Sequence, residues 1–191
     1  MNKAITEERQ HRLAGPTAAP QRFSLGMYFQ CLTRLLGQPR HFFSELDEKL
    51  GWKAPFGFLL VSSLFFAGAS LIGSMPEKTF VFGSIFFLNA LGMTLIAACA
   101  GYGVMTMIFG RRVPFVRFFS IYAFSSGVTL LAAWVPFFIW LTEPWKWWLI
   151  GIGLRRGLGF SWRQTLVIIG ISVAVICLFF WSLLPILAAL R

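Results

Sequence analysis

The sequence has 191 residues, of which 57% are hydrophobic and 17% aromatic, and its mean hydropathy is +0.72. These values exclude an ordinary soluble domain and predict an all-α membrane protein. The formal net charge of +10 would suggest a nucleic-acid partner in a soluble protein. Here the basic residues flank apolar segments, so anionic lipid headgroups are the expected counter-charge and nucleic acid is not an expected partner.

The first 53 residues are predicted to lie outside the membrane. Residues 1–22 are polar without an apolar core, and we expect a disordered tail rather than a cleavable signal peptide. In residues 23–53, apolar side chains recur at three- and four-residue intervals on both sides of 37–39. This pattern predicts two amphipathic helices on the cytoplasmic face, the second from Pro39 to Gly51. They either cap the bundle or bind a partner protein.

From residue 54 on, clusters of charged residues divide an apolar sequence into segments of membrane length. Because a helix needs about 20 apolar residues to cross a bilayer, 54–191 is predicted to be a bundle of five transmembrane helices. The predicted spans are about 55–73, 80–109, 117–134, 137–154 and 165–187. The third and fourth fit only if the chain turns near Trp134, Val135 and Pro136. A re-entrant segment at 137–154 is the alternative.

The distribution of Lys and Arg predicts the orientation. Fourteen of the 17 lie in 1–53, 110–117 and 155–163, and the other three are Lys78, Lys146 and Arg191. Because basic loops are retained in the cytoplasm, we expect a cytoplasmic N-terminus and an extracytoplasmic C-terminus. The arginines of the basic loops are candidate contacts for lipid headgroups or a partner: Arg111, Arg112, Arg117, Arg155, Arg156 and Arg163.

Three polar residues within the predicted spans form a candidate intramembrane site. Glu143 and Lys146 are three residues apart, so they share a helix face and can pair. Ionisable groups in a span cost roughly 2.5–3.5 kcal/mol each and commonly mark a pathway or a site. Alternatively, both lie at the outer interface among tryptophans, with Lys146 reaching water. Asn89, in the second span, is expected to form a hydrogen bond across helices worth about 1 kcal/mol.

The sequence contains no recognisable set of catalytic residues. Both histidines lie in the N-terminal part, and neither a metal-ligand spacing nor a phosphate-binding loop is present. We therefore expect a protein without enzymatic activity, cofactor or metal. The three cysteines, Cys31, Cys99 and Cys177, are far apart and are expected to be reduced.

Three segments carry a family resemblance through their order and spacing. They are PRHFFSEL at 39–46, FVRFFSIYAF at 115–124, and WLIGIGLR at 148–155 followed by GFSWRQT at 159–165. Together they resemble the Yip family, membrane proteins first known as interactors of Ypt/Rab GTPases, which has bacterial members. The resemblance covers about 39–187 and implies five spans with a cytoplasmic N-terminus.

Two departures limit what this resemblance implies. The acidic Asp-Leu-Tyr-Gly-Pro-type motif of eukaryotic members is absent, and Gly127 stands where many relatives have proline. Rab binding is therefore not implied. The sequence looks like a member of the bacterial branch of the family, and the expected location is the bacterial inner membrane. We expect a non-enzymatic scaffold or adaptor for partner proteins or lipids. The alternative is a small channel, transporter or lipid-moving protein with its site near the fourth span. A homo-oligomer is compatible with either.

Overall fold

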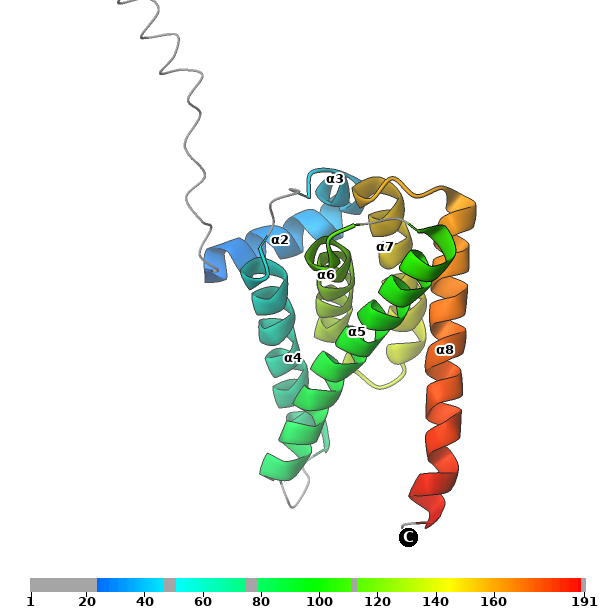
Figure 1. Ribbon diagram of the computed structural model, residues 1–191. Helices are drawn as coiled ribbons and strands as arrows, with labels where there is room; N and C mark the ends of the chain where they lie inside the picture. The colour runs from blue at the N-terminus through cyan, green and yellow to red at the C-terminus, as the bar shows by residue number, and fades with distance from the viewer. Residues whose placement is uncertain (1–23, 47–50, 75–78, 111–112, 190–191) are drawn as a thin grey trace, which may run out of the picture.

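The computed structural model describes residues 24–46, 51–74, 79–110 and 113–189, and these form seven α-helices and no strand (Figure 1). The predicted all-helical class is confirmed, whereas the predicted tail at 1–22 lies outside the described residues. The helices are α2 (Leu25–Gly37), α3 (Pro39–Ser44), α4 (Lys53–Ser74), α5 (Thr79–Phe109), α6 (Phe115–Ala133), α7 (Ile139–Gly157) and α8 (Trp162–Ala189).

The five long helices coincide with the five segments that the charge clusters delimit. Every helix end lies within three residues of the bound expected from the sequence. Among the residues that the structure describes, three of these helices are long and apolar enough to cross a membrane: Lys53–Gly73, Thr79–Phe109 and Phe115–Ala133. The segment Trp162–Leu178 of α8 is apolar as well. Helix α7 differs from all of these because it carries two arginines, a lysine and a glutamate.

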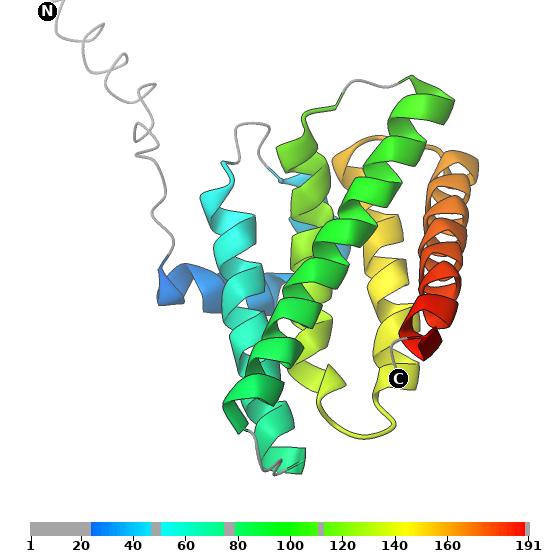
Figure 2. The ribbon, with the colours of Figure 1, turned by 60° about the horizontal axis from the view of Figure 1, so that its bottom comes forward.

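The turn between α6 and α7 lies where the sequence predicts it. Helix α6 ends at Ala133, and Trp134 is its C-terminal cap. The indole nitrogen of Trp134 donates a hydrogen bond to the Leu131 carbonyl oxygen (3.0 Å). At Phe137 the backbone has a φ of 69°, an uncommon left-handed conformation that lets the chain reverse before α7 begins. Helices α6 and α7 therefore form an antiparallel hairpin (Figure 2).

Helix α6 forms the centre of the bundle. Every residue from Phe118 to Thr129 is buried, because α4, α5 and α7 all pack against it. Close contact depends on glycines: the ring of Phe58 on α4 lies directly against Gly127, and Ile121 lies against Gly153 on α7. A Cβ at either glycine would overlap these side chains. Small residues in helix interfaces let the backbones approach closely.

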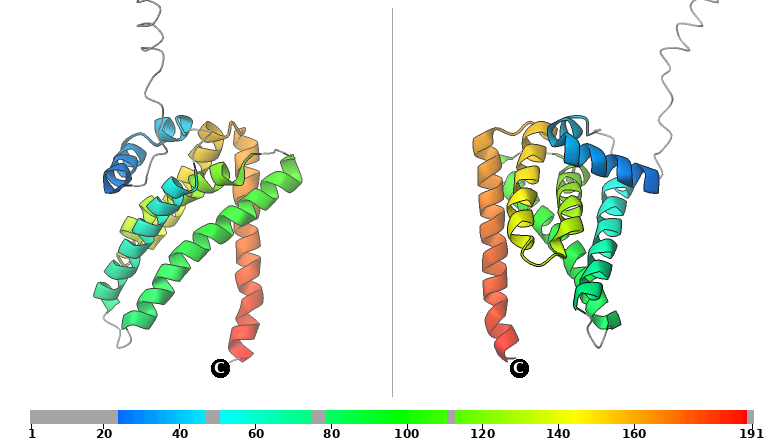
Figure 3. Two further views of the ribbon diagram at one scale, coloured as in Figure 1. Left: turned by 60° about the vertical axis from the view of Figure 1, so that its left-hand side comes forward. Right: turned by 180° about the vertical axis from the view of Figure 1, so that it is seen from behind.

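Helices α2 and α3 lie across one end of the bundle, at a large angle to the long helices (Figures 1 and 3). The Tyr28 hydroxyl is within hydrogen-bond distance of Ser62 Oγ on α4 (3.1 Å). Leu35 and Phe43 are fully buried, and the Phe43 carbonyl lies against Gly157 of α7. Burial of these side chains therefore fixes the two short helices to the bundle. We call them the α2–α3 platform.

The second helix of this platform is shorter than predicted. It begins at Pro39 as expected, but it ends at Ser44 rather than near Gly51. The chain leaves the helix at Glu45, whose carboxylate lies 3.1 Å from His41 Nδ1. Leu46, the second residue after the helix, is buried. The remainder, 47–50, lies outside the described residues.

Candidate functional site

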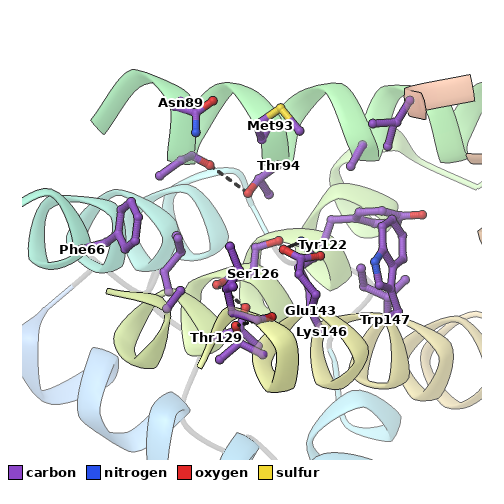
Figure 4. A pocket seen from close by; sticks show the side chains of 18 of the residues that line it. Phe66, Asn89, Met93, Thr94, Tyr122, Ser126, Thr129, Glu143, Lys146 and Trp147 are labelled. Atoms are coloured by element: carbon purple, nitrogen blue, oxygen red, sulfur yellow. Dashed lines mark hydrogen bonds and ion pairs between the residues drawn. The ribbon is translucent and has the colours of Figure 1, made fainter. Parts of the chain in front are cut away.

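The three polar residues singled out in the spans line one cavity, although they come from different helices. Asn89 lies on α5, whereas Glu143 and Lys146 lie on α7 (Figure 4). The cavity has a volume of about 430 Å³ and lies between α5, α6, α7 and α8, with one contact from α4 at Phe66. This volume falls within the range of small-molecule sites.

Glu143 and Lys146 form the ion pair expected from their spacing. Lys146 Nζ lies 2.6 Å from Glu143 Oε1. The Lys146 side chain is 22% exposed and that of Glu143 is 49% exposed, so the pair stands at the edge of the cavity. The ammonium of Lys146 also lies 5.5 Å from the centre of the Trp147 ring, within the range of a cation–π contact.

Pro144, between the two charged residues, changes the backbone of the same turn. A proline has no amide hydrogen, so it cannot donate the usual helical hydrogen bond to the carbonyl four residues earlier. That carbonyl belongs to Trp140, whose side chain is exposed. Helix α7 therefore presents a carboxylate, an ammonium and a backbone carbonyl without its usual helical donor within two turns.

Three threonine hydroxyl groups in the wall of the cavity can accept hydrogen bonds from a bound molecule. Thr94 donates to the Ala90 carbonyl (3.0 Å), Thr129 to the Ser126 carbonyl (3.0 Å) and Thr142 to the Ile139 carbonyl (3.4 Å). Each hydroxyl hydrogen is thus used within its own helix, and the lone pairs are left to accept. The other lining side chains are largely apolar: Phe66, Met93, Leu130, Ile150, Val173 and Ile176.

Tyr122 of α6 contributes a buried hydroxyl to the same cavity. This hydroxyl lies against Gly101 of α5, and its polar neighbour is the hydroxyl of Ser172 on α8. The Ser172 hydroxyl donates its own hydrogen to the Ile168 carbonyl, so it can only accept from Tyr122. The deep wall of the cavity is therefore polar.

Asn89 is the one residue of the three whose expected interaction is not seen among the described residues. Its side chain is exposed at the edge of the cavity, and it makes no hydrogen bond with any described residue. The expected interhelical hydrogen bond of Asn89 therefore stays a prediction. Its amide is left to interact with water or with a molecule in the cavity.

The predicted basic contacts lie at the opposite end of α6 and α7, beside the α2–α3 platform. The Arg117 guanidinium donates to the Gly157 carbonyl (2.9 Å), which joins the start of α6 to the end of α7. The Arg155 guanidinium stacks 5.2 Å from the Trp162 ring, and Arg156 and Arg163 are exposed. Arg111 and Arg112 lie outside the described residues. We call this end the basic end.

Sequence reasoning found the charged pair but missed the rest of the cavity wall. Tyr122, Ser126 and Thr129 recur at four- and three-residue spacing and therefore share one face of α6. This polar stripe in an apolar helix was a usable signal. Cys177 on α8 also lines the cavity and is a free, exposed thiol. Its participation could not be anticipated, because it depends on how α8 packs.

Comparison with known proteins places this architecture in one family. The model of the Yip1 domain matches residues 33–184, which include both the cavity and the basic end. No curated protein and no solved structure matches the chain. The resemblance inferred from the three segments is confirmed, and the apolar helices identify an integral membrane protein. The chain belongs to the Yip1-domain family.

Proposed function

We propose that the protein is a non-enzymatic scaffold of the bacterial inner membrane that uses the α2–α3 platform to bind partner proteins or lipids. The observation that carries this proposal is the exposed apolar face of α2. Leu25, Phe29 and Leu36 are 66%, 60% and 50% exposed, whereas Tyr28 and Leu35 on the other face are buried. An amphipathic helix with one face fixed to the bundle keeps its second face for the membrane surface or for a partner.

The proposal includes five spans, a cytoplasmic N-terminus and an extracytoplasmic C-terminus. Its support is the gathering of Arg117, Arg155, Arg156 and Arg163 at the end that carries the platform. Basic residues on the cytoplasmic side would meet anionic headgroups there. We include helix α7 among the spans because its last residue, Gly157, lies beside the start of α6, where it accepts from Arg117. A re-entrant segment is expected to be shorter than the helix it packs against.

Site-specific photocrosslinking in native membranes tests the scaffold. A photoreactive amino acid at Leu25 or Phe29 is compared with one at Leu178, which is 68% exposed on α8. We expect discrete protein adducts from the two α2 positions and lipid adducts alone from Leu178. If all three positions give only lipid adducts, α2 is a membrane anchor and the protein-scaffold part of the proposal fails.

A second candidate function, movement of a lipid or a small solute, is favoured by the cavity. Its polar wall brings Glu143, Lys146 and Asn89 together between helices that expose apolar faces to the bilayer. Protein reconstituted in liposomes should then accelerate the transfer of labelled lipid or ions, and Glu143→Gln should change the rate. Equal rates with and without protein across such a panel would remove this candidate.

A further inference from the structure

The cavity is amphipathic, with its charges at one edge and apolar side chains around them. Glu143 and Lys146 stand at the edge, and the lining residues Asn89 on α5 and Cys177 on α8 are also exposed. These two helices diverge toward the end at which the chain terminates (Figures 1 and 3). Glu143 lies about 21 Å along α7 from Gly157 at the basic end and about 6 Å from the start of the helix at Ile139, so the pair lies in the part of a bilayer about 30 Å thick that is farthest from the basic end.

The charge balance of the site favours a zwitterion over a single ion. The carboxylate and the ammonium are 2.6 Å apart, so their net charge is zero. A lone cation or anion would be attracted by one group and repelled by the other, and it would lose its water against apolar walls. A molecule with both charges can meet each group with its opposite. The apolar walls suit hydrocarbon chains attached to such a head.

The polar wall also selects the kind of positive group. In the wall of the same cavity as Glu143, the hydroxyls of Thr94, Thr129 and Thr142 have their lone pairs available because their hydrogens are used within the helices. Acceptors of this kind bind an ammonium that carries N–H donors. A quaternary ammonium has no such donor and is held by aromatic cages. In this cavity the ammonium of Lys146 already lies over the Trp147 ring, so this ring is not free to bind a quaternary ammonium.

We propose that the cavity binds one phospholipid whose headgroup carries a primary ammonium and a phosphate diester. Glu143 meets the ammonium, Lys146 meets the phosphate, and the acyl chains leave between α5 and α8. Asn89 lies at this exit and can hydrogen-bond the phosphate or ester oxygens. This inference rests on the second candidate function, since it names the molecule that the cavity would hold.

Lipid retention by the full-length protein tests the proposal. The protein is equilibrated with equal amounts of ethanolamine, choline and glycerol phospholipids of identical chains, and native mass spectrometry counts the lipids retained after purification. We expect the ethanolamine lipid to be retained at least about fivefold over each of the others. Loss of one charge-assisted contact in Glu143→Gln or Lys146→Gln should lower this retention about tenfold. Ser84→Ala, a polar change on α5 outside the cavity lining, is the control and should retain as much as the wild type.

Equal retention of the three lipids by the wild-type protein would overturn the proposal. Preference for the glycerol lipid would do so as well, because it would indicate Lys146 acting alone. The double variant with Glu143→Lys and Lys146→Glu keeps the ion pair. It therefore controls for a loss of retention that is caused only by misfolding of the single variants, which lack the pair. It should retain the ethanolamine lipid, since the headgroup can bind in the reversed direction.

Native cysteines give an independent readout of occupancy. Cys177 lines the cavity, whereas Cys99 is an exposed thiol of α5 that does not line it. In nanodiscs, an ethanolamine lipid should slow alkylation of Cys177 at least about threefold relative to a choline lipid, and Cys99 should react equally in both. Equal rates at Cys177 would contradict the proposal. If the lipid binds but liposomes show no transfer, the site stands and the lipid-moving function fails.

Discussion

Replacing Phe43 with alanine probes how the α2–α3 platform is held on the bundle. The Phe43 side chain is fully buried, and its ring lies edge-on to Phe42, with the ring centres 5.4 Å apart. A buried phenylalanine removes about 150–250 Å² from solvent, worth roughly 4–6 kcal/mol at about 25 cal/mol per Å². Phe→Ala substitutions in cores cost about 3–5 kcal/mol, so we expect a loss of about 4 kcal/mol.

This loss should appear first as undocking of the platform, because Phe43 lies at the contact between α3 and α7. Hydrogen exchange of the protein in nanodiscs measures it directly. The amides of 25–44 should exchange up to roughly a thousandfold faster in Phe43→Ala, as about 4 kcal/mol implies. Phe29→Ala is the matched control: this ring is 60% exposed on α2, so its removal should change exchange by less than about threefold.

Two results would refute this reasoning. Equal exchange in the two variants would mean that Phe43 does not fix the platform. A uniform loss of protection through α4–α8 would mean that the platform and the bundle unfold as one unit rather than separately. Either result would also weaken the proposal that α2 acts as a distinct docking element.

Three further predictions concern packing, helix termination and thiol chemistry. Gly153→Ala should lower the stability by about 1–3 kcal/mol because a Cβ overlaps the Cγ2 methyl of Ile121, and in a thermal melt it should cost less in an Ile121→Ala background, which removes that methyl, than in the wild type. Arg117→Ala should cost about 1.5–3 kcal/mol through loss of the bond to the Gly157 carbonyl, and an unchanged melting temperature would contradict this. Burial raises the pKa of the Cys31 thiol, which Arg34 partly offsets, so less thiolate is present at neutral pH. Alkylation of Cys31 should therefore be slower than in the isolated peptide of residues 25–37 and should accelerate at a higher pH; Arg34→Gln should slow it further.

The positions of the long helices could be predicted because they depend on local sequence. Charge clusters and the aromatic turn near Trp134 interrupt an apolar chain wherever a helix must end, and the structure follows them. The pairing of Glu143 with Lys146 was predictable for the same reason, since three residues along one helix fix their proximity.

The cavity itself could not be predicted, because it depends on contacts between distant segments. Asn89 and Lys146 are 57 positions apart, and they share a cavity only through the diagonal course of α5 across the bundle. The early end of α3 was not predicted either, because the helical pattern continues in the sequence beyond Ser44, whereas in the structure the helix ends there and Leu46 is buried.

The unequal lengths of the helices have a consequence for the surrounding lipid. Helix α7 has 19 residues, about 28 Å, whereas α5 has 31 residues, about 46 Å. Lipids beside α7 therefore meet a shorter wall than lipids beside α5, even after α5 is tilted. A bilayer adapts to such a mismatch by local thinning or by tilting the protein. We expect the protein to concentrate where membrane thickness changes, such as at the edge of an ordered domain, and to sort between membranes by thickness.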